Sequence, residues 1–206
     1  MARRQNYRNE RDKFYIITNG EATEDNYFRL LKAYRSIYDV EIEFQNHDPL
    51  ALVNYARKYT QDANQVWCVF DVDNSHKENK LIPALTQAEK FGIKIAYSNV
   101  AFEVWLISHF QKCASPLNTK DHQKILNEYL AKKGFKGSYE KSDKEMLKRY
   151  FIPFYTQAIC NAKVVYQTYI KEHTAQYGPT SRYCIWDWNS STTVFKLVEA
   201  LNLQKK

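Results

Sequence analysis

The sequence predicts an α/β protein with a mainly parallel four-stranded sheet, helices on both faces of that sheet and a helical C-terminal extension. Short apolar runs at residues 14–18, 65–71 and 93–98 have the length of buried strands, and an alternating run at 40–44 has the pattern of an edge strand. Helical patterns separate these runs, as the right-handed crossovers between parallel strands require. After about residue 111 only helical patterns remain.

Local signals mark the helix ends in the first half of the chain. Thr23 is the expected N-cap of the first helix, Asp48 followed by Pro49 is a typical helix start, and Gly92 is a typical C-cap. The helices expected here cover residues 23–36, 48–59, a stretch ending near 91, and 101–110.

In the second half, Ser142 is a candidate N-cap, Pro153 a break or kink, and Ser190 or Ser191 the cap of the last helix. The helices expected here cover residues 119–132, 142–151, 153–173 and 192–201.

The length of 206 residues suits one domain with an appendage. We expect three parts: a mobile basic N-terminus over residues 1–12, an α/β core over 13–110, and a helical extension over 111–206 that packs on the core.

The composition favours a cytoplasmic protein with a phosphate-rich partner. Lysine and arginine number 30 against 23 aspartates and glutamates, and such an excess suits nucleic acid. The 16 tyrosines could stack on unpaired bases or fill the core, and both interpretations stay open. The 4 cysteines form neither a zinc motif nor a disulfide framework. The absence of a signal peptide and of an apolar run of about 18 residues argues against a membrane location.

The clearest candidate site is Asp71-Val72-Asp73, at the end of the apolar run 65–71. Residues two apart in an extended chain point the same way, so both carboxylates can face one metal. Mg²⁺ prefers such oxygen ligands, and two metal ions would activate a nucleophile and stabilise the leaving oxygen in phosphodiester cleavage. The other interpretation is a solvated turn in which Asp73 or Asn74 caps the segment that follows.

Further polar residues follow the other strands. Asn19, Gly20 and Glu21 come after the first strand, where Gly20 permits a tight turn. Glu21 or Glu24 could bind a metal or complement the dipole of the next helix. Glu103, one turn into the helix after the fourth strand, could reach the same cleft or be an ordinary first-turn acid.

Three other groups are weaker candidates. His109, on an apolar helix, could contact substrate or form a hydrogen bond in the core. Lys163 could neutralise phosphate charge in a transition state or be an ordinary surface lysine. Lys132, Lys133 and Lys136 form a basic stretch that could bind a nucleic-acid backbone. The glycine patterns of dinucleotide-binding and P-loop proteins are absent from the sequence.

These motifs together resemble one family. The chain carries, in order, Asn-Gly-Glu-Ala-Thr-Glu-Asp-Asn-Tyr-Phe from Asn19, Phe-Asp-Val-Asp from Phe70, Ser-Asn-Val-Ala-Phe-Glu-Val-Trp-Leu-Ile-Ser-His-Phe from Ser98, Asn-Ala-Lys from Asn161 and Asn-Ser-Ser-Thr-Thr-Val-Phe-Lys-Leu-Val-Glu-Ala-Leu from Asn189. This order resembles the RloB family over about residues 12–203.

The resemblance implies a Toprim-like fold and nuclease activity. RloB proteins resemble Toprim domains and are usually encoded beside an ABC/SMC-like ATPase in bacterial anti-phage (abortive-infection) systems. The implied reaction is Mg²⁺- or Mn²⁺-dependent cleavage of nucleic acid, and because related Toprim effectors attack tRNA, RNA and DNA are both candidate substrates. The implied partners are nucleic acid and the ATPase, and the protein could form a homo-oligomer.

Matched by position, Asp71 and Asp73 correspond to the Asp-x-Asp pair that binds metal in Toprim domains. Asn19 stands where a Toprim domain has a glutamate. Its neutral carbonyl can bind a metal but cannot act as a carboxylate base.

Glu21 or Glu24 could compensate for Asn19, with Glu103 as a base or outer ligand and Lys163 supporting the transition state. His109 belongs to the most specific block of the family pattern. The alternative function is a catalytically weak or inactive binding subunit of the ATPase complex, which Asn19 favours.

Overall fold

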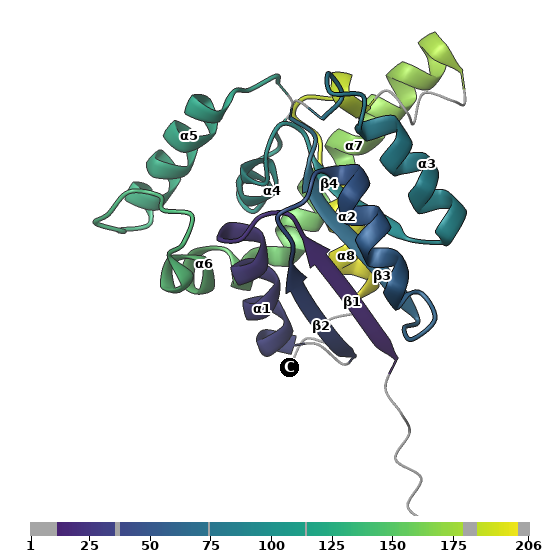
Figure 1. Cartoon of the computed structure of the whole chain (residues 1–206). Coiled ribbons are helices and arrows are strands. Elements are labelled where there is room, and N and C mark those ends of the chain that lie inside the picture. The colour runs from purple at the N-terminus through teal and green to yellow at the C-terminus, as the bar shows by residue number, and fades with distance from the viewer. Residues whose placement is uncertain (1–11, 36–37, 74, 114, 179–184, 202–206) are drawn as a thin grey trace, which may run out of the picture.

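The protein, described here from a computed structural model, contains a four-stranded, all-parallel sheet with strand order β2-β1-β3-β4 (Figure 1). The structure describes residues 12–35, 38–73, 75–113, 115–178 and 185–201. The strands are β1 (Lys13–Thr18), β2 (Asp39–Phe44), β3 (Gln65–Asp71) and β4 (Lys94–Ser98). This arrangement is consistent with a Rossmann-like fold and confirms the predicted α/β class. The expected mobile N-terminus lies outside the described residues, apart from Asp12.

Helices cover both faces of the sheet (Figure 1). One face packs against α2 (Pro49–Ala56) and α3 (Leu81–Phe91). The other packs against α1 (Thr23–Arg35), α4 (Glu103–Ser108) and α8 (Val194–Ala200). Further from the sheet on this side lie α5 (Thr119–Lys132), α6 (Lys144–Tyr150) and α7 (Tyr155–Tyr177), which contact α1, α4 and α8.

The central strand β3 is apolar between its two polar end residues, Gln65 and Asp71, because both of its faces are covered. Trp67 and Val69 join the core on the α1 side, whereas Val66, Cys68 and Phe70 join the core on the α2 side. A two-sided burial of this kind gives parallel strands their continuous apolar runs. The buried Cys68 is therefore a small core residue, as its apolar neighbours in sequence indicate.

Several element ends differ from the sequence-based expectation. Asp143, rather than Ser142, caps α6, because its carboxylate accepts a hydrogen bond from the Met146 N–H at 2.8 Å. Pro153 lies in a short 3-10 turn before α7, and α7 continues past the expected end to Tyr177. The expected helix over residues 101–110 is the shorter α4.

The segment before α8 lies along the free edge of β4. Ser98 and Thr192 form an antiparallel bridge, and the Asn99 N–H donates to the Ser191 carbonyl at 2.8 Å. The Tyr97 N–H donates to Thr193 Oγ1 at 3.0 Å. The last helix therefore begins at Val194, because the residues before it bond to β4. The expected cap residue Ser190 instead donates its hydroxyl to the Ser115 carbonyl at 3.1 Å.

None of the helices in the described part of the chain combines the length and the apolar character needed to cross a bilayer.

We expect Thr193→Val to destabilise the protein by about 1–3 kcal/mol, because the buried Tyr97 N–H would lose its acceptor while side-chain volume is kept. Urea unfolding measures this. Thr86→Val is the matched control, because the exposed Thr86 hydroxyl bonds only to its own helix, and we expect a change within about 0.5 kcal/mol. Equal effects of both substitutions would contradict the role given to Thr193.

Candidate functional site: an acidic pocket containing one lysine

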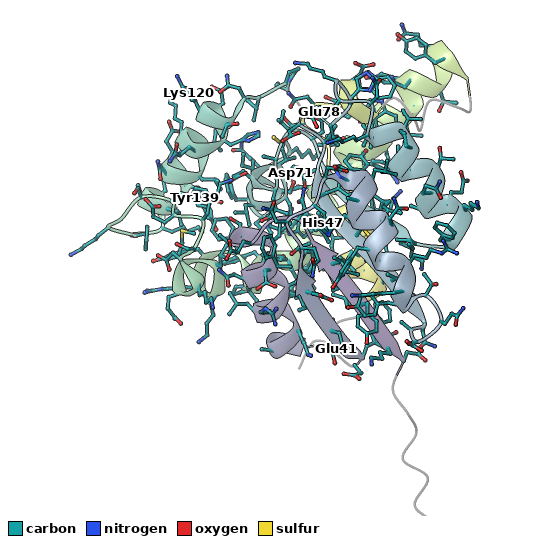
Figure 2. All side chains as sticks on the ribbon, viewed as in Figure 1. Glu41, His47, Asp71, Glu78, Lys120 and Tyr139 are labelled. Atoms are coloured by element: carbon teal, nitrogen blue, oxygen red, sulfur yellow. The ribbon has the colours of Figure 1, made fainter. Side chains whose placement is uncertain are left out.

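A pocket of about 310 Å³ lies where β1 and β3 end and α1 begins. Its lining comes from the turn after β1, the end of β3 and the loop between α5 and α6: Asn19, Gly20, Glu21, Ala22, Thr23, Glu24, Asp71, Asp73 and Lys141. Figure 2 shows Asp71 at the end of the sheet that faces this loop, with Tyr139 on the loop itself. The pocket thus lies at the carboxyl edge of a parallel sheet, where open α/β proteins bind ligands.

The turn after β1 directs Glu24 into the pocket. The Asn19 N–H donates to the Val69 carbonyl at 3.1 Å, which continues the pairing with β3 for one more residue. A side chain at Gly20 would overlap the Glu24 carboxylate, so the glycine lets that carboxylate lie against the turn. Glu24 is 7% exposed, whereas Glu21 is exposed at the pocket's lining. Of the two glutamates left open by the sequence, Glu24 is the buried one.

The two aspartates after β3 have different environments. Asp71 is the last residue of β3, and its Oδ1 is enclosed without a hydrogen-bond partner among the described residues. Asp73 is exposed, has a positive φ of 25° and accepts a hydrogen bond from the Ser75 N–H at 3.2 Å. Asp73 therefore also has the turn-forming contact that the alternative interpretation predicted, while it lines the same pocket as Asp71.

Glu103, the first residue of α4, lies behind the pocket and is only 3% exposed. Its Oε1 accepts a hydrogen bond from the Tyr139 hydroxyl at 3.1 Å and forms an ion pair with Lys141 Nζ at 3.1 Å. Its Oε2 is buried and has no hydrogen-bond partner among the described residues. Glu103 is thus coupled to the loop between α5 and α6.

The carboxylates of Glu24, Asp71 and Glu103 repel one another. Burial, followed by the charges of Glu24 and Glu103, raises the pKa of Asp71 well above its usual range. Burial and then the charge of Glu103 raise the pKa of Glu24 to about 7. The positive charge of Lys141 opposes both increases. A group of buried acids with perturbed pKa values is typical of functional sites.

Lys141 reaches the pocket because three contacts fix the segment that carries it. The Tyr139 N–H donates to Asn127 Oδ1 at 2.6 Å, and the Tyr139 hydroxyl donates to Glu103. The Thr23 hydroxyl donates to the Lys141 carbonyl at 3.2 Å. Thr23 is the first residue of α1, and its hydroxyl ties that helix to the loop between α5 and α6. Its side chain is therefore not the expected N-cap. Nothing in the sequence links Thr23 to Lys141, which is 118 positions away.

The donor set of the pocket fits a hard divalent cation in its chemistry. Carboxylate oxygens of Glu24, Asp71 and Asp73 and the amide of Asn19 are ligands that Mg²⁺ accepts, and the partnerless Oδ1 of Asp71 needs a partner. Among the described residues, no three aspartate, glutamate, histidine or cysteine side chains already have the spacing that binds one ion. Metal binding would therefore require the side chains to converge.

The comparison with protein families agrees with the motifs in the sequence. The family model described as RloB-like protein matches residues 14–201.

The chain belongs to the RloB-like family.

No curated protein and no solved structure matches the chain. The match includes every residue that lines the pocket, from Asn19 to Lys141.

Other candidate residues lie outside the pocket of this RloB-like protein. Lys163 forms an ion pair with Glu199 at 3.0 Å and does not line the pocket. Lys132, Lys133 and Lys136 are exposed at the end of α5 and in the turn after it. Their proposed contact with substrate stays a prediction.

His109 is a core residue in the structure and is 2% exposed, so the packing interpretation fits it better than contact with substrate. Its Nε2 lies 3.0 Å from the Tyr27 hydroxyl, and its Nδ1 lies 3.0 Å from the Trp105 carbonyl. Burial lowers the pKa of His109 to about 4.

His122 on α5 was not a candidate in the sequence, although it is fully buried and neither ring nitrogen has a hydrogen-bond partner among the described residues. Burial lowers its pKa, and the charge of Glu103 opposes that decrease. A histidine in a lysine-rich helix gives no signal of such a position in the sequence.

We expect His109 to make the protein less stable as the pH falls from about 6.5 to 4. The unfolded chain takes up a proton near pH 6.5, whereas the folded protein resists protonation of His109 until about pH 4, and this difference corresponds to about 3 kcal/mol. Urea unfolding of wild type and His109→Gln at pH 7.5, 5.5 and 4 measures it. The variant should lose less stability on acidification, whereas His47→Gln should behave as wild type does. Identical pH profiles for wild type and His109→Gln would contradict this.

We expect Gly20→Ala to expel the Glu24 carboxylate from the pocket without unfolding the protein, because only the end of a flexible side chain must move. The pKa of Glu24 should then fall from about 7 toward the ordinary value of about 4.3, since burial is its main cause. Carbon-13 NMR titration of the Glu24 carboxyl group measures the shift. Gly92→Ala, at the distant end of α3, should leave the Glu24 pKa near 7. A Glu24 pKa that stays near 7 in Gly20→Ala would count against this contact.

Proposed function

We propose that this RloB-like protein is a metal-dependent nuclease subunit that hydrolyses phosphodiester bonds of RNA, such as tRNA, or of DNA in anti-phage defence. The observation that supports this most is the cluster of mutually repelling carboxylates of Glu24, Asp71 and Glu103 at the carboxyl edge of the sheet, of which Glu24 and Glu103 are buried and Asp71 is half-buried with an enclosed Oδ1. Enclosing carboxylate oxygens that have no partner among the described residues, here Asp71 Oδ1 and Glu103 Oε2, destabilises a protein, so a function that needs these groups is the simplest reason to keep them. The family resemblance to Toprim domains points the same way.

In this proposal Asp71, Asp73 and Asn19 would hold one or two Mg²⁺ or Mn²⁺ ions. When bound, such ions lower the pKa of water and neutralise charge on the scissile phosphate. Glu24, with a pKa of about 7, can accept or release a proton near neutral pH and is the residue best suited to act as an acid or base. Glu24 would thus supply the carboxylate that Asn19 lacks, and Glu21 would be an outer residue.

Glu103 has a supporting role in this proposal. It does not line the pocket, and its Oε1 bonds to Tyr139 and Lys141, so it orients those two residues. The enclosed position separates it from a substrate phosphate.

The segment that carries Lys141 is basic and is the proposed contact for nucleic acid. Residues 111–150 contain ten lysines and arginines against five aspartates and glutamates. Exposed cations of this kind bind a phosphate backbone without reading its sequence. Lys132, Lys133 and Lys136 belong to this segment and are proposed to contact substrate outside the pocket. The proposed protein partner is the ABC/SMC-like ATPase.

A second candidate function is a binding or regulatory subunit of that ATPase complex with little or no catalysis. The neutral Asn19 and the lack of a ready-made group of three metal-binding side chains in the described part of the chain favour it.

We expect the purified protein, with or without the ATPase, to cleave tRNA or DNA when Mg²⁺ or Mn²⁺ is added. Asp71→Asn should lower the rate by at least about a hundredfold, because it removes a metal-binding charge and keeps the side-chain shape. Asp73→Ala should also lower the rate. Asp62→Asn is the matched control, since Asp62 is exposed and does not line the pocket, and its rate should equal that of wild type. Gel electrophoresis of labelled nucleic acid measures cleavage.

The two candidate functions give different results in this experiment. Equal rates of nucleic-acid cleavage for the wild-type protein and Asp71→Asn, together with phage resistance in cells that carry the Asp71→Asn variant, would rule out the nuclease and favour the binding subunit.

A further inference from the structure

Lys141 lies on a loop that other contacts hold in place. Its side chain forms an ion pair with the buried Glu103, although the lysine side chain is itself 60% exposed. Its ammonium group lies 3.1 Å from Glu103, and the charges of Glu103, Glu24 and Asp71 raise its pKa against the opposing effect of burial. The lysine is therefore the positive charge that partly neutralises the acidic pocket in the described part of the chain.

The contacts of the loop divide into a fixed part and a movable part. Backbone and tyrosine contacts hold the loop: Tyr139 bonds to Asn127 and Glu103, and the Lys141 carbonyl accepts from Thr23. The lysine side chain itself forms one ion pair and is mostly in solvent, where such pairs contribute little to stability. The ammonium can therefore leave Glu103 while the loop stays in place.

A divalent cation entering the pocket would meet this ammonium group. Asp71 and Glu24 line the pocket together with Lys141, and like charges at such short range repel. A cation bound at Asp71 would therefore repel the lysine that the charges of Glu103, Glu24 and Asp71 attract. Among the described residues no three acids already have the spacing that binds one ion, so the acids would have to converge as the cation enters.

We propose that Lys141 is a built-in counter-ion that occupies the acidic pocket at rest and is displaced from Glu103 when a divalent cation binds. This inference rests on the proposed function, because it assigns a control of metal binding to the same pocket. Displacement frees the Lys141 ammonium group at the entrance of the pocket, where it can contact a phosphate of the substrate. The helical region would thereby couple metal binding to substrate binding.

Mn²⁺ titration tests the competition without any measurement of cleavage. Free Mn²⁺ is followed by electron paramagnetic resonance at fixed ionic strength for wild type, Lys141→Met, Lys141→Arg and Lys144→Met. Lys141→Met should bind Mn²⁺ more tightly than wild type, on the order of tenfold, because a competing charge is gone. Lys141→Arg, which keeps the charge, and Lys144→Met, which removes an exposed lysine from the same segment, should bind as wild type does.

A second measurement uses the wild-type protein alone. An amine-reactive reagent with mass-spectrometric detection should label Lys141 several-fold faster in Mg²⁺ than without it, because the displaced amine leaves its ion pair. Labelling of Lys144 should not change. This measurement decides the matter if Lys141→Met does not fold.

The outcomes separate this inference from the proposed function. Mn²⁺ affinity that is unchanged or weaker in Lys141→Met, or Lys141 labelling that Mg²⁺ does not accelerate, would overturn the counter-ion role even if the protein cleaves nucleic acid. Tighter binding by Lys141→Met in a protein that cleaves nothing would support the counter-ion role and reject the nuclease. Mn²⁺ binding by none of the variants would overturn both.

Discussion

The repulsion among buried carboxylates at the end of the sheet is the constraint that explains most of this pocket. Asp71 is fixed there because β3 runs through the centre of the sheet, and the lack of a side chain at Gly20 lets the Glu24 carboxylate lie against the same turn. The charges of Glu24 and Glu103 raise the pKa of Asp71, the charge of Glu103 raises that of Glu24, and Lys141 opposes both effects. The loop that supplies Lys141 is therefore part of the site as well as of the helical region.

The helical region and the sheet act as one structure. Residues of α5, α6 and α7 share a hydrophobic core with β1 and β3, and the segment before α8 bonds to the free edge of β4. The same packing that covers the sheet on this side holds Tyr139 and Lys141 against Glu103.

Much of the fold could be predicted from the sequence because it rests on local patterns. The apolar runs, the Asp48-Pro49 helix start and the Gly92 helix end all correspond to elements in the structure. Two of the errors fall where a distant segment takes over a local role: Thr23 bonds to the Lys141 carbonyl, and Thr192 and Thr193 bond to β4. His109 shows the same limit, since the sequence left its role open and packing gave it two core hydrogen bonds.

The sequence by itself determined the parallel sheet, the position of Asp71 and Asp73 at a strand end, and the family pattern, because strand period and helix-end signals act over a few residues. Only the tertiary structure decided which acids lie together and which basic side chain, Lys141, lies beside them. Glu24 is enclosed and Glu21 is exposed although they are three residues apart, because the turn at Gly20 directs only one of them inward. Lys141 is one of many lysines in the sequence. It becomes part of the site through contacts with Thr23 and Glu103, which no local pattern encodes.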